Sequence, residues 1–235
     1  MTIPRDRRKN ASKRKSENGI LSARPCVKPA LISSGIHELC LAGSHDAVVL
    51  VPELSLSSPP RPLILSLHGA GANAHDAIQP FRRLSDEKRL LVLAPNARGE
   101  SWDGIDGAWG PDVDLIDAAL HWVFDRCAID HTRIAIAGFS DGASYALSLG
   151  LANGDLFSHI IAFSPGFLRA TTRQGKPKIF VSHGSADALF PLGRCSQRIV
   201  SRLEHDGYDV RFDEFEGGHS VPPTVARQAV DWIIS

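Results

Sequence analysis

The sequence predicts an α/β fold, with a mostly parallel, twisted sheet that is covered by helices on both faces. Short apolar runs such as Leu63–Leu67 and Lys178–Ser182 lie between turn residues, which is typical of buried strands. These runs alternate along the chain with segments of helical periodicity such as Pro111–Cys127. The 235 residues are 43% hydrophobic and 22% charged, which suits one globular domain with a sizeable core.

Charge is spread unevenly along a chain whose formal net charge is zero. Residues 1–36 carry nine Lys or Arg and two acidic residues, which leaves 17 basic and 24 acidic residues for residues 37–235. We therefore predict a basic, largely disordered leader over 1–36 and an acidic folded domain over 37–235. The basic clusters of the leader also fit a nuclear address or an organelle transit peptide, but a solvated tail is the simpler interpretation. The acidic domain shows no pattern for binding nucleic acid, so none is expected as a partner.

Cysteine usage and hydropathy indicate where the protein works. Four cysteines are scattered without a C-x-x-C pair, so we predict reduced thiols and a cytoplasmic protein. No apolar run approaches the ~20 residues that span a bilayer, and the N-terminus has no apolar signal region. Integral membrane association is therefore not expected. The sequence carries no signal for an oligomeric state.

The first part of the expected domain begins with a hairpin. His37–Ala42 and Ala47–Val51 are short strand-like runs on either side of a Gly-Ser-His-Asp turn. Four prolines in residues 52–62 indicate a loop. The next expected elements are a strand over 63–67, a helix over roughly 74–89 and a strand over 90–94.

A loop without periodicity over residues 98–110 contains two tryptophans, four glycines and two aspartates. Pro111 then suits the first turn of a helix, and Asp112 and Asp114 lie near its positive end. The remaining expected elements are a strand over 134–137, a helix over 143–151, strands over 159–163 and 178–182, a helix over 194–205, a strand over 208–215 and a helix over 223–234. The segment between the strands at 159–163 and 178–182 is too short for a substantial cap domain, so we expect an open site.

The strand that begins at Ile134 passes into the next helix through Gly138-Phe139-Ser140-Asp141-Gly142. A serine at such a junction is raised above the sheet, and the crowded turn requires small residues two positions before and after it. Both positions are glycine, so we predict that Ser140 is a nucleophile. The structural alternative is a Gly-rich turn in which Ser140 only caps the helix.

A serine nucleophile needs a general base, and the base needs a group that orients it. The carboxyl ends of parallel strands meet at one edge of a sheet, so both groups are expected in loops that follow later strands. Asp187 follows the strand at 178–182, and His219 follows the strand at 208–215. We predict Asp187 as the orienting acid and His219 as the base.

Other residues compete for these two roles. His183 also ends a strand and is the weaker candidate for the base, while Asp213 and Glu214 are weaker candidates for the acid. His68 and His183 are each followed by glycine, and we expect both to support their loops through ring hydrogen bonds.

An oxyanion hole needs two donors that point at one place. The amide of Asp141, directly after the nucleophile, is one expected donor. The second should come from the loop after the strand at 63–67, where Gly69-Ala70-Gly71 lets the backbone approach closely. We predict the amide of Ala70, with that of Gly71 as the next candidate.

The substrate pocket is expected at the same edge of the sheet. Large apolar side chains on loops there could form a slot, and the candidates, with Gly71, are Trp102, Trp109, Phe167 and Leu189. The alternative for these side chains is packing in the core. Asp103 lies in the loop over 98–110 that carries both tryptophans, which we call the tryptophan loop, and Asp112 lies just after it. These two residues could either stabilise the loop or face a substrate.

Four segments together resemble the α/β-hydrolase superfamily: His68-Gly69-Ala70-Gly71, Gly138-Phe139-Ser140-Asp141-Gly142, His183-Gly184-Ser185-Ala186-Asp187 and Gly217-Gly218-His219. More narrowly, they are similar to its small phospholipase/carboxylesterase group, which includes acyl-protein thioesterases and dienelactone-hydrolase-like enzymes. The similarity covers about residues 45–235. It implies a serine hydrolase of carboxylic esters or thioesters, with the triad and oxyanion amides given above and a catalytic domain over 37–235.

Such chemistry needs no cofactor, and the sequence shows no dinucleotide fingerprint and no spacing typical of metal ligands. The expected partner is therefore a small-molecule ester. Two alternatives stay open at this point. One is a polyester depolymerase or peptidase that uses the same triad, and the other is a non-catalytic binding module on a hydrolase fold.

Overall fold

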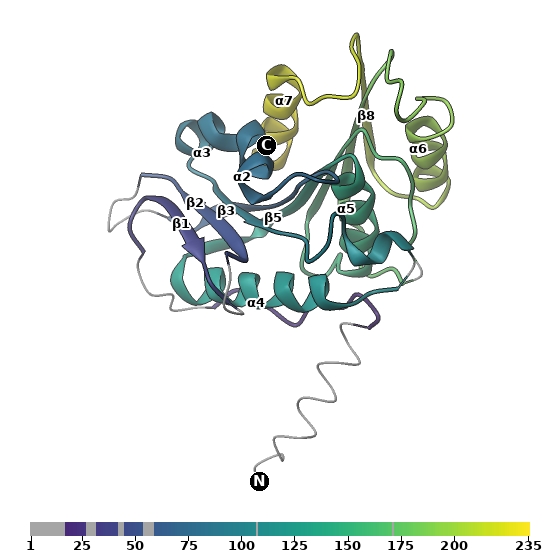
Figure 1. Ribbon diagram of the computed structural model, residues 1–235. Helices are drawn as coiled ribbons and strands as arrows, with labels where there is room; N and C mark the ends of the chain where they lie inside the picture. Colours follow the sequence, from purple (N-terminus) through teal and green to yellow (C-terminus); the bar gives the residue numbers. More distant parts are fainter. Residues whose placement is uncertain (1–16, 27–31, 42–44, 54–58, 107, 171) are drawn as a thin grey trace.

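The structure is a computed structural model that describes residues 17–26, 32–41, 45–53, 59–106, 108–170 and 172–235. Within these residues, eight strands form one sheet in the order β1-β2-β4-β3-β5-β6-β7-β8 (Figure 1). The pairs β1–β2 and β2–β4 are antiparallel and all other neighbours are parallel, which confirms the predicted sheet. The strands are β1 (Gly35–Leu39), β2 (Ala47–Val51), β3 (Arg61–Leu67), β4 (Leu91–Pro95), β5 (Ile129–Phe139), β6 (His159–Phe163), β7 (Lys178–Gly184) and β8 (Val210–Phe215).

Helices cover both faces of the sheet because successive strand residues point to opposite sides. Leu63 and Leu65 of β3 pack in the core formed with α4, α5 and α6, while Ile64 packs in the core formed with α2, η1, α3 and α7. Figure 1 shows α2, α3 and α7 together on one side of the sheet and α4 on the other. The helices are α2 (Ala74–Ile78), η1 (Gln79–Phe81), α3 (Arg82–Lys88), η2 (Asp103–Asp106), α4 (Pro111–Arg126), α5 (Asp141–Ala152), α6 (Ser196–His205) and α7 (Pro223–Ile234).

Two expected elements differ from the prediction, since the strand expected over 134–137 is part of the longer β5, which begins at Ile129. The single helix expected over 74–89 is divided into α2, η1 and α3. Pro80 lies in the short 3₁₀ segment between the two α-helices, where its missing amide cannot continue the α-helical hydrogen bonds. Among the described helices, none combines the length and the apolar composition that crossing a membrane requires.

Strands β3 and β5 are neighbours at the point where the chain changes direction across the sheet. The chain leaves β3 toward α2 on one face and leaves β5 toward α5 on the other. Their last ladder pair is Leu67 with Gly138, so the loop after β3 lies beside the turn that contains Ser140. Ligands of open α/β sheets bind at such switch points.

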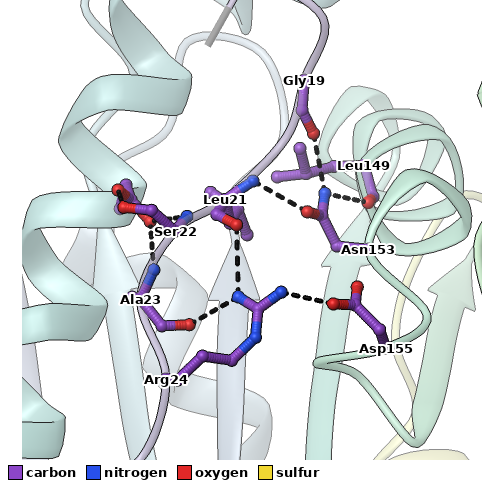
Figure 2. Close-up of polar contacts among 9 residues, drawn as sticks. Gly19, Leu21, Ser22, Ala23, Arg24, Leu149, Asn153 and Asp155 are labelled. Atoms are coloured by element: carbon purple, nitrogen blue, oxygen red, sulfur yellow. Dashed lines mark hydrogen bonds and ion pairs between the residues drawn. The ribbon is translucent and has the colours of Figure 1, made fainter. Parts of the chain in front are cut away.

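Residues 17–26, which we call the strap, pack against the domain instead of being disordered as expected for most of the leader. Leu21 is 1% exposed, and its amide donates to Asn153 Oδ1 at 2.8 Å. Figure 2 shows Asn153 between the backbones of Gly19 and Leu21, and its Nδ2 donates to the Gly19 carbonyl at 2.7 Å. Asp117 of α4 accepts from the Ser22 amide at 2.7 Å. The rest of the expected leader, at 1–16 and 27–31, lies outside the described residues.

Replacing Leu21 by alanine is expected to lower the free energy of unfolding by about 2–4 kcal/mol, because it leaves a cavity in the main core. Leu189→Ala is the matched control, since Leu189 is 62% exposed and its truncation should change stability by less than about 0.5 kcal/mol. Urea denaturation of the three proteins measures the difference. Equal stability of Leu21→Ala and the wild type would show that the strap is not docked in solution.

His159, at the start of β6, should make stability fall in mildly acidic solution. Burial lowers its pKa from 6.5 to about 4, and Lys178 adds to the effect. Between these values the unfolded chain binds a proton that the folded chain excludes, so stability is full above pH 6.5 and is lost as pH falls. The loss at pH 4 is expected to be up to about 3 kcal/mol relative to pH 7. In His159→Phe, the difference in free energy of unfolding between pH 7 and pH 4 should be smaller by that amount. An unchanged difference would exclude His159 as its source.

Candidate active site

Ser140 lies at the sharp turn between β5 and α5 with φ 58° and ψ −121°, a conformation that a residue with a side chain rarely adopts. The turn is crowded on both sides. A Cβ atom on Gly138 would lie 2.1 Å from the Gly142 carbonyl oxygen, and one on Gly142 would lie 2.4 Å from the His68 carbonyl oxygen. The glycines predicted from the sequence are therefore sterically required, and the geometry is that of a nucleophile elbow.

Asp187 and His219 meet at the same edge of the sheet. His219 Nδ1 lies 2.6 Å from Asp187 Oδ2, and the carboxylate is fully buried. The other oxygen, Oδ1, accepts hydrogen bonds from the amides of Leu189 at 2.9 Å and Phe190 at 2.8 Å. Burial alone would raise the pKa of Asp187, but the hydrogen bonds from the Phe190 amide, the His219 ring and the Leu189 amide hold it below its ordinary value.

The His219 ring lies against the elbow. Its centroid is 4.7 Å from that of Phe139, the residue before Ser140, and Phe190 packs edge-on at 5.4 Å. Nε2 is buried and makes no hydrogen bond to any described residue, Ser140 included. The ring nitrogen that faces away from Asp187 is thus available for a proton beside the elbow, as a general base requires.

The two competing histidines support loops, as expected. His68 Nε2 accepts from the Ala97 amide at 3.0 Å, so its Nδ1 carries the proton toward the Gly69 carbonyl at 2.8 Å. Burial lowers the pKa of His68, which favours this neutral form. His183 is fully buried and lies between Ser196 Oγ at 2.6 Å and the Phe190 carbonyl oxygen at 2.7 Å. Neither ring has a nitrogen free for Ser140.

The two amides predicted as oxyanion donors are those of Ala70 and Asp141. Within the described residues, no hydrogen bond from the amides of Ala70 or Asp141 is found. The Gly71 amide, the next candidate, donates to the Glu100 carbonyl at 2.8 Å and is not free. Gly69 packs against the elbow, because a Cβ atom there would lie 3.4 Å from Ser140 Cβ. This arrangement favours Ala70 over Gly71.

Among the expected pocket residues, the structure contradicts Trp102. Trp102 is 2% exposed and packs in the core between His68 and Tyr145, with ring centroids 4.8 and 5.2 Å away. Leu189 is on the surface, while Trp109 packs edge-on against Tyr145. Phe167 is half-buried beneath the Arg169 guanidinium. The prediction of Trp102 as a pocket residue is therefore wrong, because its side chain is buried in the core.

Asp103 and Asp112 stabilise the tryptophan loop. Asp103 Oδ2 accepts from the Asp112 amide at 2.7 Å, and Asp112 Oδ2 accepts from the Asp103 amide at 2.9 Å. Tyr145 donates its hydroxyl to Asp103 at 3.1 Å. Burial raises the pKa of Asp103 above its ordinary value. Both carboxylates are therefore used within the protein.

A cavity that sequence reasoning missed adjoins the elbow. It has a volume of about 200 Å³ and is lined by Gly69, Phe139, Phe81, Phe163 and Val221, among others. Val221 follows His219 by two residues, and Phe139 precedes Ser140. No pattern in the sequence marks these residues, because they come from elements that only the folded chain brings together.

Comparison with known proteins agrees with this geometry. The sequence model of a family described as Phospholipase/Carboxylesterase matches residues 90–234, which include Ser140, Asp187 and His219. The candidate hydrolase MhqD of Bacillus subtilis (strain 168) is 24% identical over 184 residues, which are 72% of this chain and 91% of that protein.

Two solved structures show the same fold. Esterase PE8 is 21% identical, with a TM-score of 0.62 over 87% of this chain and 99% of that one. The S-formylglutathione hydrolase FrmB of Staphylococcus aureus is 17% identical, with a TM-score of 0.67 over 85% of this chain and 97% of that one. The fold is that of an α/β-hydrolase.

Proposed function

Because the chain belongs to the phospholipase/carboxylesterase family and is a hydrolase by that membership, we propose that it cleaves carboxylic esters through an acyl-enzyme on Ser140. One observation carries the proposal. The buried Asp187 carboxylate lies 2.6 Å from the His219 ring, and the opposite nitrogen of that ring has no hydrogen-bond partner among the described residues, beside the strained elbow of Ser140. A base that a carboxylate orients in this way can activate a serine hydroxyl that comes within its reach.

In the proposed reaction, Ser140 Oγ attacks the ester carbonyl carbon while His219 Nε2 takes the hydroxyl proton. The amides of Ala70 and Asp141 stabilise the negative oxygen of the tetrahedral intermediate. Collapse of the intermediate expels the alcohol, which receives the proton from His219. A water molecule then attacks the acyl-enzyme by the same route and releases the carboxylic acid. A thioester would react in the same way, with a thiol as the leaving group.

The cavity beside Phe139 supports a small apolar substituent on the ester. Its lining is mostly apolar, with Ser66, His68 and Asp76 as the polar members, and Gly69 and Phe139 join it to the elbow. Apolar clefts with few polar groups are the usual form of small-molecule sites.

The test is a p-nitrophenyl acetate assay with rapid mixing. The proposal expects turnover, an initial burst of p-nitrophenol near one equivalent and a mass increase of one acetyl group on the peptide containing Ser140. In Ser140→Ala all three signals should disappear. Undiminished turnover by that variant would overturn the proposal.

A further inference from the structure

One short segment joins the two loops that supply the proposed oxyanion donors. Residues 100–102, which we call the brace, follow β4 and contact both loops. The Glu100 carbonyl accepts from the Gly71 amide at 2.8 Å, and Trp102 Nε1 donates to the His68 carbonyl at 2.9 Å. Ser101 Oγ donates to Asp141 Oδ2 at 2.8 Å.

The amides of Ala70 and Asp141 lie beyond the ends of β3 and β5, so the hydrogen bonds of the sheet do not fix their positions. The last ladder pair of β3 and β5 is Leu67 with Gly138, and Ala70 and Asp141 each follow that pair by three residues. An oxyanion hole depends on the distance between its two amides, since each must lie within hydrogen-bond distance of one oxygen. The brace bonds to residues on both sides of Ala70 and to the side chain of Asp141, so it can hold that distance.

Ser101 makes the contact on the α5 side. Asp141 is half-buried, and within the described residues its carboxylate has Ser101 as its hydrogen-bond donor. Asp141 also begins α5, so its amide and its side chain belong to the same first turn. Without the serine hydroxyl, the brace loses this contact to the first turn of α5, so the Asp141 amide is held less firmly relative to the Ala70 amide.

We propose that the brace fixes the spacing of the Ala70 and Asp141 amides, with Ser101 as a positioning residue that acts through Asp141. The inference rests on the proposed ester hydrolysis. The proposal gives the tryptophan loop a role in stabilising the transition state. Trp102 itself is buried and does not line a pocket.

The test compares Ser101→Ala, Ser101→Thr, Asp141→Ala and the double variant Ser101→Ala/Asp141→Ala on p-nitrophenyl acetate. Rates are normalised to active sites that are titrated with a fluorophosphonate, so misfolded protein does not contribute. Ser101→Ala is expected to lower kcat about 10-fold with little change in KM, less than the 10²–10³ typical of losing a whole donor. Ser101→Thr, which keeps a hydroxyl, should recover most of the loss. The double variant should lose little more than either single one, because both remove the same contact.

A matched control is Thr132→Ala, which removes a hydroxyl bonded to Asp130 at 2.6 Å on the surface and should leave kcat unchanged. Affinity for an aryl boronic acid, a mimic of the tetrahedral intermediate, should fall with kcat in Ser101→Ala. The inference is overturned if Ser101→Ala keeps kcat within twofold, if Ser101→Thr is as slow as Ser101→Ala, or if the single losses multiply in the double variant. Full activity of Ser140→Ala would instead overturn the proposed function, so the two failures are distinct.

Discussion

Ser140→Ala is expected to lower kcat for ester hydrolysis by about 10⁶-fold, with a residual rate that binding and the oxyanion amides supply. The neighbouring serines cannot take over. Ser144, one turn along α5, accepts from the Gly166 amide at 3.0 Å and the Phe167 amide at 3.3 Å, and Ser164 is fully buried. Steady-state assays with p-nitrophenyl acetate measure the loss. A decrease of less than 100-fold would indicate a different nucleophile.

Comparing Ser140→Gly with Ser140→Ala separates the effect of the hydroxyl on catalysis from the effect of backbone strain on stability. Both variants lack the hydroxyl and should be equally inactive. The wild-type φ of 58° is strained for a residue with a side chain, whereas glycine adopts it freely. Ser140→Gly should therefore exceed Ser140→Ala in free energy of unfolding by about 1 kcal/mol. Equal stabilities in urea denaturation would show that the elbow stores no strain.

The turn at Ser140 and the positions of Asp187 and His219 were predictable, because steric requirements and the order of the strands determine them. Glycines two positions either side of Ser140 are forced by contacts of 2.1 and 2.4 Å, a steric requirement that appears directly in the sequence. Asp187 follows β7 and His219 follows β8, and parallel strands bring their ends to one edge. The order of the elements therefore brings Asp187 and His219 together without any knowledge of side-chain packing.

Side-chain direction in loops was not predictable. Trp102 lies in a segment without periodicity, so the sequence does not distinguish a pocket from the core, and its indole bond to the His68 carbonyl decides the matter. The strap is similar. Its sequence shows no periodicity. Its anchor Asn153 lies 132 residues after Leu21, and its anchor Asp117 lies 95 residues after Ser22. Contacts between such distant polar residues leave no local pattern.

Asp187→Asn is expected to lower kcat about 10⁴-fold while the protein stays folded. The amides of Leu189 and Phe190 both donate to Oδ1, so the asparagine oxygen must occupy that position. The NH₂ group then replaces Oδ2 and points its hydrogens at His219 Nδ1, 2.6 Å away in the wild type. The ring must respond by placing its proton on Nε2, which can no longer accept one from Ser140.

His183 provides the control for this argument, since its Nε2 lies 3.2 Å from Asp187 Oδ2 as well. If His219 is the base, His219→Gln should match or exceed the loss in Asp187→Asn, and His183→Gln should lose less than about 10-fold per titrated site. His183 is held between Ser196 and the Phe190 carbonyl, whereas His219 Nε2 has no such partner in the part of the chain that the structure describes. The His219 ring lies against Phe139, the residue before Ser140. If His183→Gln were nevertheless the more damaging change, the base would be misassigned, because Asp187 Oδ2 lies close enough to orient either ring.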